Sequence, residues 1–134
     1  MSIKSLVIAI TEKCNLKCAM CNIWKTENPV DLSLEKFEKL HNLKYINLSG
    51  GEPFLRSDLC DIVKILKKNN PNSNIIISSN GLLTNQIVSL MKKLVFIDKN
   101  IGIRISIDGT EKIHNEIRGV EKSFENAIQT IKEL

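Results

Sequence analysis

Three cysteines that lie close together in the sequence are the residues best suited to chemistry. Cys14, Cys18 and Cys21 fall within eight residues, at a C-x3-C-x2-C spacing. Thiolates bind zinc and iron–sulfur clusters, and three of them leave one iron of a four-iron cluster without a protein ligand. A structural zinc ion needs a fourth ligand, which would have to be Cys60 or His41, each on a predicted helix and far along the chain. The spacing therefore favours an iron–sulfur cluster over zinc.

The composition is that of one ordinary globular domain, residues 1–134, with 43% apolar and 25% charged residues. Four cysteines are too few for a disulfide scaffold, and three of them are clustered, which predicts a reducing compartment and a cytoplasmic location. The net charge of +4 is spread along the chain, so the sequence predicts no nucleic-acid partner. No apolar run approaches the roughly 18 residues of a membrane span, so no membrane association is expected either.

Segments rich in β-branched residues alternate with segments of helical periodicity. Strands are predicted at residues 3–10, 43–48, around 75–77 and at 101–107. Four helices are predicted with Ser33, Ser57, Thr84 and Ser123 as N-caps, and their apolar faces are Leu34, Phe37 and Leu40, then Leu59, Ile62, Val63 and Leu66, then Ile87, Leu90, Met91 and Leu94, and last Phe124, Ile128 and Ile131. Residues 111–118 are expected to be a short irregular or helical piece. This alternation predicts an α/β fold with parallel strands and right-handed crossovers.

The unusual residues follow the predicted strands in every unit. They are the cysteine segment 14–21 and the segments 50–53, 79–81 and 106–109. In α/β sheets and barrels, ligands bind at the carboxyl ends of the strands. The four segments are therefore expected to meet at one site.

Two motifs in this order resemble the radical S-adenosyl-L-methionine (SAM) superfamily: the cysteine motif after a first strand, and Gly50-Gly51-Glu52-Pro53 after a second. Residues 106–119 are similar to the branch that holds the molybdenum-cofactor cyclases and the peptide- and sulfatase-maturing (SPASM-type) enzymes. The resemblance covers nearly the whole chain. It implies a partial TIM-type (βα) barrel, and this chain supplies about four parallel βα units of the family's core of about six, too few to close a barrel.

The resemblance implies a cofactor, a reaction and partners. Cys14, Cys18 and Cys21 would bind three irons of a [4Fe-4S] cluster, and the fourth iron would bind the amino and carboxylate groups of SAM. Reductive cleavage of SAM would give a 5′-deoxyadenosyl radical that takes a hydrogen atom from a substrate. The electron would come from a low-potential donor of the flavodoxin or ferredoxin type.

The resemblance also implies roles for the residues of the other motifs. Gly50 and Gly51 would bring the main chain close to the SAM ammonium, the Glu52 carboxylate would accept from it, and Pro53 would rigidify the turn. A contact to the ribose is expected from Asn80, and contacts to the ribose or the methionyl carboxylate from Ser106 and Asp108, two residues apart on one face at the end of the fourth strand. Arg118 is expected to pair with that carboxylate, and Met20, where the family more often has an aromatic residue, to pack against adenine. Trp24 is expected to cover the cysteine segment, and His114 to make a structural hydrogen bond.

Alternatives from the residues alone remain open at each of these positions. The Gly-Gly-Glu-Pro segment is also typical of a strand-to-helix turn, Asn80 of a turn, Asp108 of a turn cap and Arg118 of a surface. A non-catalytic iron–sulfur or zinc module is a second function to consider, and a scaffold that needs a partner chain is a third. We expect the chain to be the N-terminal part of a longer core domain, whose missing half, or another chain, covers the open edge of the sheet.

Overall fold

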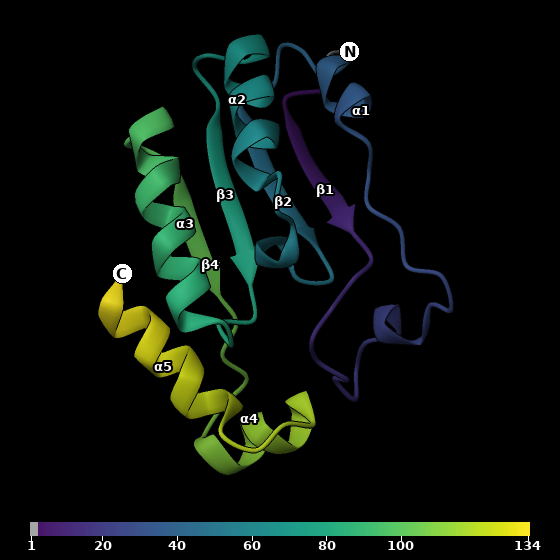
Figure 1. Ribbon diagram of the computed structural model, residues 1–134, viewed down its shortest axis with the longest axis vertical. Coiled ribbons are helices and arrows are strands. Elements are labelled where there is room, and N and C mark those ends of the chain that lie inside the picture. Colours follow the sequence, from purple (N-terminus) through teal and green to yellow (C-terminus); the bar gives the residue numbers. More distant parts are fainter. Residues whose placement is uncertain (1–2) are drawn as a thin grey trace.

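Four parallel strands form one sheet in the computed structural model, which describes residues 3–134 (Figure 1). The strands are β1 (Ser5–Thr11), β2 (Tyr45–Gly50), β3 (Asn74–Ser79) and β4 (Gly102–Ile105), and they lie in the order β1-β2-β3-β4. Each strand pairs in parallel with the next one along the chain. The α/β prediction with about four parallel units is confirmed. The fourth strand is shorter than predicted, so Ser106 and Asp108 lie in the loop beyond it and not on the strand itself.

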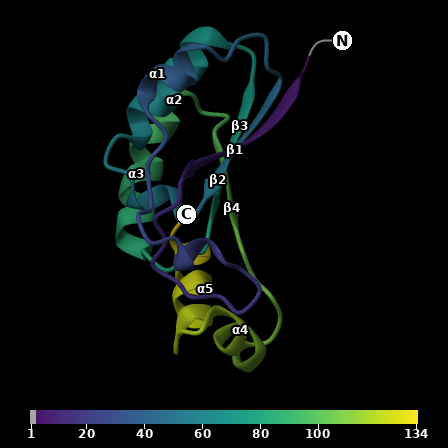
Figure 2. The ribbon, with the colours of Figure 1, turned by 90° about the vertical axis from the view of Figure 1, so that its right-hand side faces the viewer.

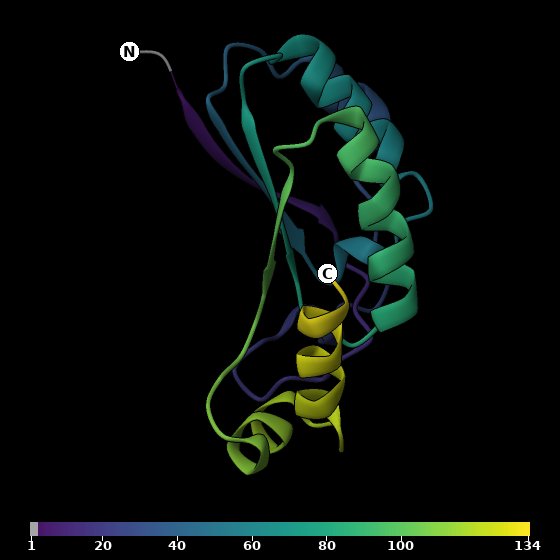
Figure 3. The same cartoon turned by 90° about the vertical axis from the view of Figure 1, so that its left-hand side faces the viewer.

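The helices are confined to one face and one end of the sheet. They are α1 (Leu34–Glu38), α2 (Leu59–Asn69), α3 (Thr84–Ile97), α4 (Glu111–Arg118) and α5 (Ser123–Glu133), with single 3-10 turns η1 (Ile23–Lys25) and η2 (Pro53–Leu55). The edge-on view shows α1, α2 and α3 on one side of the strands and no helix opposite them (Figure 2). The view from the other side shows α4 and α5 below the end of β4 (Figure 3). Within the described residues no helix is both long enough and apolar enough to cross a membrane.

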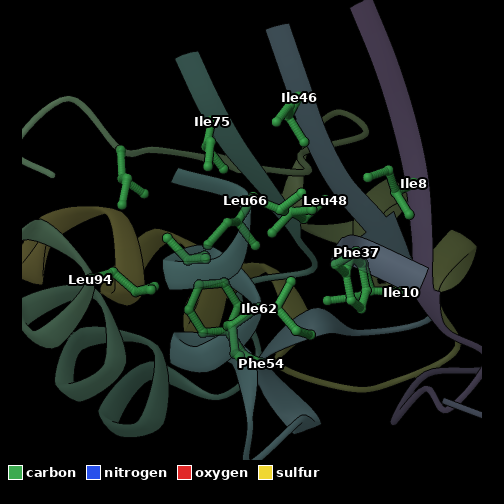
Figure 4. Close-up of a cluster of buried hydrophobic side chains, with 14 of the residues drawn as sticks. Ile8, Ile10, Phe37, Ile46, Leu48, Phe54, Ile62, Leu66, Ile75 and Leu94 are labelled. Carbon is green, nitrogen blue, oxygen red and sulfur yellow. The ribbon is translucent and has the colours of Figure 1, made fainter. Parts of the chain in front are cut away.

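The covered face of the sheet carries the core, because alternate strand residues point toward the helices. Ile8, Ile46 and Ile75 on three adjacent strands pack against Phe37 of α1 and Ile62 of α2 (Figure 4). Burial of each such side chain contributes about 1.5–3 kcal/mol. The apolar face predicted for α2 is buried in full, which confirms the helical periodicity.

The opposite face of the sheet is open. Val7 and Tyr45 lie on it with 66% and 57% of their surface exposed. Ser78 on the same face donates to the Asn47 side chain at 2.9 Å. Toward the carboxyl ends of the strands this face is polar, with Ser49 and Ser78, and there the candidate site begins.

The last helix packs in a different way from the prediction. α5 buries Ser123, Ala127 and Thr130, whereas 47% of the Ile131 surface is exposed. The buried face of α5 consists of small residues because the helix lies directly against the turn at Gly81. A Cβ added to Gly81 would be 3.1 Å from Ala127. Of the predicted face, Phe124 and Ile128 are half-buried, whereas Ile131 is exposed, so the prediction was wrong at Ile131 and did not include the fully buried small residues.

Of the four predicted N-caps, only Ser33 occupies that position. α2 begins after Asp58 instead of Ser57, and Thr84 and Ser123 are the first helical residues of their helices. Their hydroxyls have other partners, since the Ser123 hydroxyl donates to the Asn115 side chain at 2.8 Å and that of Thr84 lies 2.7 Å from the Thr130 hydroxyl. Tertiary hydrogen bonds thus replaced the local caps.

Candidate cofactor site

A pocket opens at the carboxyl ends of the four strands, where the cysteine segment, the Gly-Gly turn and the β3 and β4 loops meet. It is lined by Cys14, Leu16, Cys18, Met20, Cys21, Ile23, Ser49, Gly50, Gly51, Ser78, Ser79, Asn80, Ser106 and Arg118. Nine of the residues predicted for the site lie on this wall. Glu52, Pro53 and Asp108, which were also predicted, lie behind it.

The cysteines lie in a loop, residues 12–31, that leaves the end of β1 and returns to it (Figure 1). The base of this loop is closed by main-chain hydrogen bonds from Glu12 to Val30 and from Leu32 to Ile10, both at 2.9 Å. The buried Thr11 hydroxyl donates to the Asp31 carboxylate at 2.6 Å. The loop is therefore held at a fixed distance from the sheet.

Arg56 adds a buried cation to this base. Its guanidinium donates to the main-chain carbonyls of Ile10 and Leu32 at 2.6 and 2.8 Å, and it forms a bidentate pair with Asp58. That pair lowers the pKa of the Asp58 carboxyl. Because Arg56 follows η2, which starts at Pro53 of the Gly-Gly-Glu-Pro segment, it joins that segment to the base of the cysteine loop.

The tip of the loop rests on the end of α4. The Ala19 amide donates to the Ile117 carbonyl at 2.8 Å. The indole of Trp24 donates to the Cys18 carbonyl at 3.2 Å, so Trp24 covers the loop as predicted. An added Cβ on Gly119 would lie 3.1 Å from the Lys17 carbonyl. The loop tip and the end of α4 thus contact each other through their main chains.

The Gly50-Gly51 turn passes so close to the cysteine loop that no side chain fits. A Cβ on Gly51 would lie 2.0 Å from the Lys13 carbonyl oxygen and 3.1 Å from the Cys14 Cβ. A Cβ on Gly50, whose φ is +118°, would lie 2.3 Å from the Thr11 carbonyl. Two main-chain hydrogen bonds of 2.8 Å, from Gly51 to Thr11 and from Glu52 to Lys13, join the two segments. The turn therefore forms one wall of the pocket with main-chain atoms alone.

The Glu52 carboxylate does not face the pocket, which corrects the expectation that it accepts from a ligand ammonium. It is fully buried and accepts from the Phe54 amide, the Ser79 hydroxyl and the Asn80 amide at 3.1, 3.0 and 2.8 Å. Burial raises the pKa of Glu52, and these three donors oppose the rise. Glu52 joins the ends of β2 and β3, and Pro53 beside it starts the buried turn η2.

Asn80 belongs to both the pocket wall and the scaffold. Its side-chain amide donates to the Asn15 side chain at 2.8 Å, and its oxygen accepts from the Leu82 amide at 2.9 Å. The first bond joins the β3 turn to the cysteine loop across 65 positions in the chain. The turn interpretation of Asn80 is therefore observed together with its place on the wall.

Arg118 lies in the pocket wall and is not a surface residue, since its side chain is only 11% exposed. Its guanidinium pairs with both oxygens of Asp108, at 2.5 and 3.0 Å. The nitrogen that this pairing leaves free, Nη1, lies 3.8 Å from the Cys18 sulfur. Asp108 thus orients Arg118 from behind, and Ser106 lines the wall beside it.

The donor set of the pocket suits an iron–sulfur cluster. Cys18 is buried, Cys14 and Cys21 are half-buried, and no disulfide joins the described cysteines. Burial raises the pKa of the Cys14 thiol, so a metal would have to displace its proton. Within residues 3–134 no three acidic, histidine or cysteine side chains converge on one point that could hold a single metal ion. Three thiols spread over one pocket wall fit a cluster, in which each thiolate takes a different iron.

The other five residues of the wall were not predicted as site residues. Three of them, Ser49, Ser78 and Ser79, lie within the last two residues of β2 and β3, and their signal was a small polar residue at the carboxyl end of an apolar strand. Leu16, between the first two cysteines, and Ile23, after the third, supply the apolar part of the pocket wall. These apolar positions left no distinctive signal, since loops also carry single apolar residues.

The family follows from a comparison with known proteins. The model of the radical SAM superfamily matches residues 8–134, and the chain belongs to this family. Proteins of the family use a [4Fe-4S] cluster and SAM.

Two relatives come from the branch that residues 106–119 indicated. The probable GTP 3′,8-cyclase of Methanococcus aeolicus is 32% identical over 97% of this chain and 49% of its own. The sporulation killing factor maturation protein SkfB of Bacillus subtilis is also 32% identical, over 97% of this chain and 32% of its own. The predicted resemblance is thus confirmed, and the chain spans about half or less of these relatives.

A solved structure has the same fold. Streptococcus suis SuiB bound to S-adenosylmethionine matches 98% of this chain and 30% of its own, with a TM-score of 0.72 and 21% identity. The same protein bound to its precursor peptide SuiA gives a TM-score of 0.71. At this identity the likeness shows the fold, and it confirms the partial TIM-type barrel.

Proposed function

We propose that this chain is the N-terminal part of a radical SAM core domain that binds a [4Fe-4S] cluster through Cys14, Cys18 and Cys21. The observation that carries the proposal is that these three cysteines and the Gly50-Gly51 turn line one pocket at the carboxyl ends of the strands. When bound and reduced, the cluster and SAM supply the 5′-deoxyadenosyl radical that takes hydrogen from a substrate. The protein positions both cofactors and excludes water from them.

The residues of the wall have roles that follow from their chemistry. Main-chain carbonyls of Gly50 and Gly51 accept from the SAM ammonium, because the absence of a Cβ allows close approach. The free nitrogen of Arg118 pairs with the SAM carboxylate. Asn80 and Ser106 contact the ribose, and Met20, which is 60% exposed at the mouth, packs against adenine.

Anaerobic reconstitution with iron and sulfide tests the cluster and the SAM site together. We expect the reconstituted chain to bind about four irons, one for each iron of a [4Fe-4S] cluster. We expect SAM to perturb the electron paramagnetic resonance (EPR) spectrum of the reduced cluster. Cys18→Ala should lose both signals, and Cys60→Ala, whose thiol lies on α2 outside the pocket, is the matched control. An unchanged iron content in Cys18→Ala would contradict the assignment.

Cleavage of SAM to 5′-deoxyadenosine, with dithionite as the reductant, tests the activity. In the complete protein a low-potential donor of the flavodoxin or ferredoxin type would supply the electron. A spectrum that stays unchanged when SAM is added would instead favour an iron–sulfur module without catalysis.

The open edge of the sheet is where we propose that the rest of the protein attaches. β4 is an edge strand, and an uncovered edge invites pairing with another segment. We propose that later strands of the same protein, or another chain, cover it. The relatives are named for a GTP cyclase and for maturation of the sporulation killing factor, so a nucleotide and a precursor that is matured are the two substrate classes that we propose to test. The unpaired cysteines agree with a cytoplasmic location.

A further inference from the structure

A buried histidine that does not line the pocket stands behind the Asp108–Arg118 pair. His114 is in the first turn of α4 and has none of its surface exposed. Its Nδ1 accepts a hydrogen bond from the Asp108 amide at 3.2 Å. The Asp108 carboxylate in turn holds Arg118, whose free nitrogen reaches the Cys18 sulfur. Three residues thus form a line from the core to the pocket.

The hydrogen bond fixes the protonation state of the imidazole. Because the Asp108 amide donates to Nδ1, that nitrogen carries no proton, and the proton of the neutral ring is on Nε2. Nε2 is buried and has no hydrogen-bond partner among the described residues. The nearest aromatic ring, Phe124, packs edge-on against the imidazole, with ring centroids 5.7 Å apart. A buried N–H without a partner is costly, so a histidine used only for packing would be a poor choice here.

The loop that carries Asp108 is held at its start by the Ser106 amide, which donates to the Ser79 carbonyl at 3.0 Å, and through the Asp108 side chain by Arg118. It lies between the end of β4 and the start of α4 and contains Gly109, whose φ is +145°. Thr110, the N-cap residue of α4, makes no capping bond with its side chain. Nδ1 of His114 is therefore the acceptor that ties the Asp108 main chain to the helix.

We infer that His114 is a positioning residue: its unprotonated Nδ1 fixes Asp108, and Asp108 aims Arg118 at the pocket next to Cys18. The inference rests on the proposed function, since it assigns to Arg118 the SAM carboxylate. His114 touches neither cofactor. It acts by fixing the orientation of the Asp108 carboxylate. Without the Nδ1 acceptor, the Asp108–Arg118 pair can turn away from the pocket.

Two substitutions separate positioning from packing. In His114→Asn the side-chain oxygen falls near the place of Nδ1 and still accepts from the Asp108 amide, whereas in His114→Gln the polar group falls near Nε2. SAM affinity of the reconstituted chain is measured by calorimetry. We expect His114→Gln to weaken binding about tenfold and His114→Asn to recover most of that loss. Leu94→Val, a core change on α3 away from the pocket, controls for lost stability alone.

Equal SAM affinities for His114→Asn and His114→Gln, at equal iron content, would overturn the inference. A second readout needs neither iron nor SAM. Two-bond ¹H–¹⁵N spectra of the imidazole in the metal-free chain should show an unprotonated Nδ1 and a protonated Nε2, and a proton on Nδ1 would overturn the inference as well. If the wild-type chain binds no SAM but has this tautomer, the proposed function fails while the His114–Asp108 bond stands.

Discussion

The cysteine loop is attached to the fold at two places, and the two attachments differ in kind. At its base the loop is tied to β1 by main-chain bonds, by the buried Arg56 and by the Thr11–Asp31 contact. At its tip it rests on α4 through one main-chain bond and the line from His114 to Arg118. The base comes from segments early in the chain, whereas the tip depends on a helix about a hundred residues later.

This difference indicates a division of tasks. The base places Cys14 next to the Gly50-Gly51 turn through contacts that bear no relation to a ligand. The tip places Cys18 next to Arg118, the one cation among the described residues that line the pocket. Damage to the base should therefore lower the stability of the chain, and damage to the tip should change the cofactor site at little cost in stability.

Gly51→Ala should have the largest effect. The added methyl group would lie 2.0 Å from a main-chain oxygen of the cysteine loop, so the base must shift as a whole. We expect a loss of about 3 kcal/mol in the free energy of unfolding, measured by urea titration. Gly102→Ala is the matched control, because its methyl group would meet only the Ile76 side chain at an ordinary 3.6 Å. Similar losses for the two variants would argue against the tight base.

Arg56→Lys should have the next largest effect on stability. Lysine keeps the charge but cannot reach two carbonyls and a carboxylate at once, which leaves buried acceptors without donors. We expect a loss of about 2 kcal/mol, read from the same titration. Arg104→Lys, an exposed arginine on the open face of the sheet, should lose almost nothing. If Arg56→Lys were as stable as the wild type, Arg56 would have no role in closing the loop.

A drop in pH should weaken the attachment at the tip before it weakens the attachment at the base. Burial, and then Arg118, lowers the pKa of His114 below its ordinary 6.5, while Asp108 opposes this. Below about pH 6.5 the unfolded chain therefore binds a proton at His114 that the folded chain does not bind. The free energy that holds the loop tip on α4 falls as the pH drops from about 6.5 toward the lowered pKa. Arg56 lowers the pKa of Asp58 below 3.8. The Arg56–Asp58 pair therefore stabilises the base at every pH above about 3.8, and this stabilisation is lost only as the pH falls from there through the lowered pKa.

Trp24 is the only tryptophan and bonds to the Cys18 carbonyl at the loop tip, so its fluorescence reports on the cysteine loop. We expect its emission to change in mildly acidic buffer, before the far-ultraviolet circular dichroism of the whole chain changes. His114→Asn removes the titrating group and should abolish the early change. A single transition shared by both signals would mean that tip and base open together.

The sequence predicted the two attachments unequally. The periodicity of α2 and the order of strands and helices defined the covered face of the sheet, because local pattern and burial agree there. Position after a strand also brought the cysteines, the Gly-Gly turn, Asn80 and Ser106 to one pocket. The inward direction of Glu52 could not be predicted, because it depends on donors 27 and 28 positions away in the chain. The buried face of α5 depends in the same way on the distant turn at Gly81.

Lys13→Ala should have the smallest effect, although Lys13 makes the most visible ion pair of the base. Its ammonium lies 2.7 Å from Asp31, but the two side chains are 52% and 34% exposed. We expect a loss of at most about 0.5 kcal/mol, which disappears in high salt. Thr11→Val removes the buried hydroxyl that donates to the same carboxylate and should cost about 1 kcal/mol in any salt. If the lysine variant lost more than the threonine variant, surface charge and not the buried hydrogen bonds would close the loop at its base.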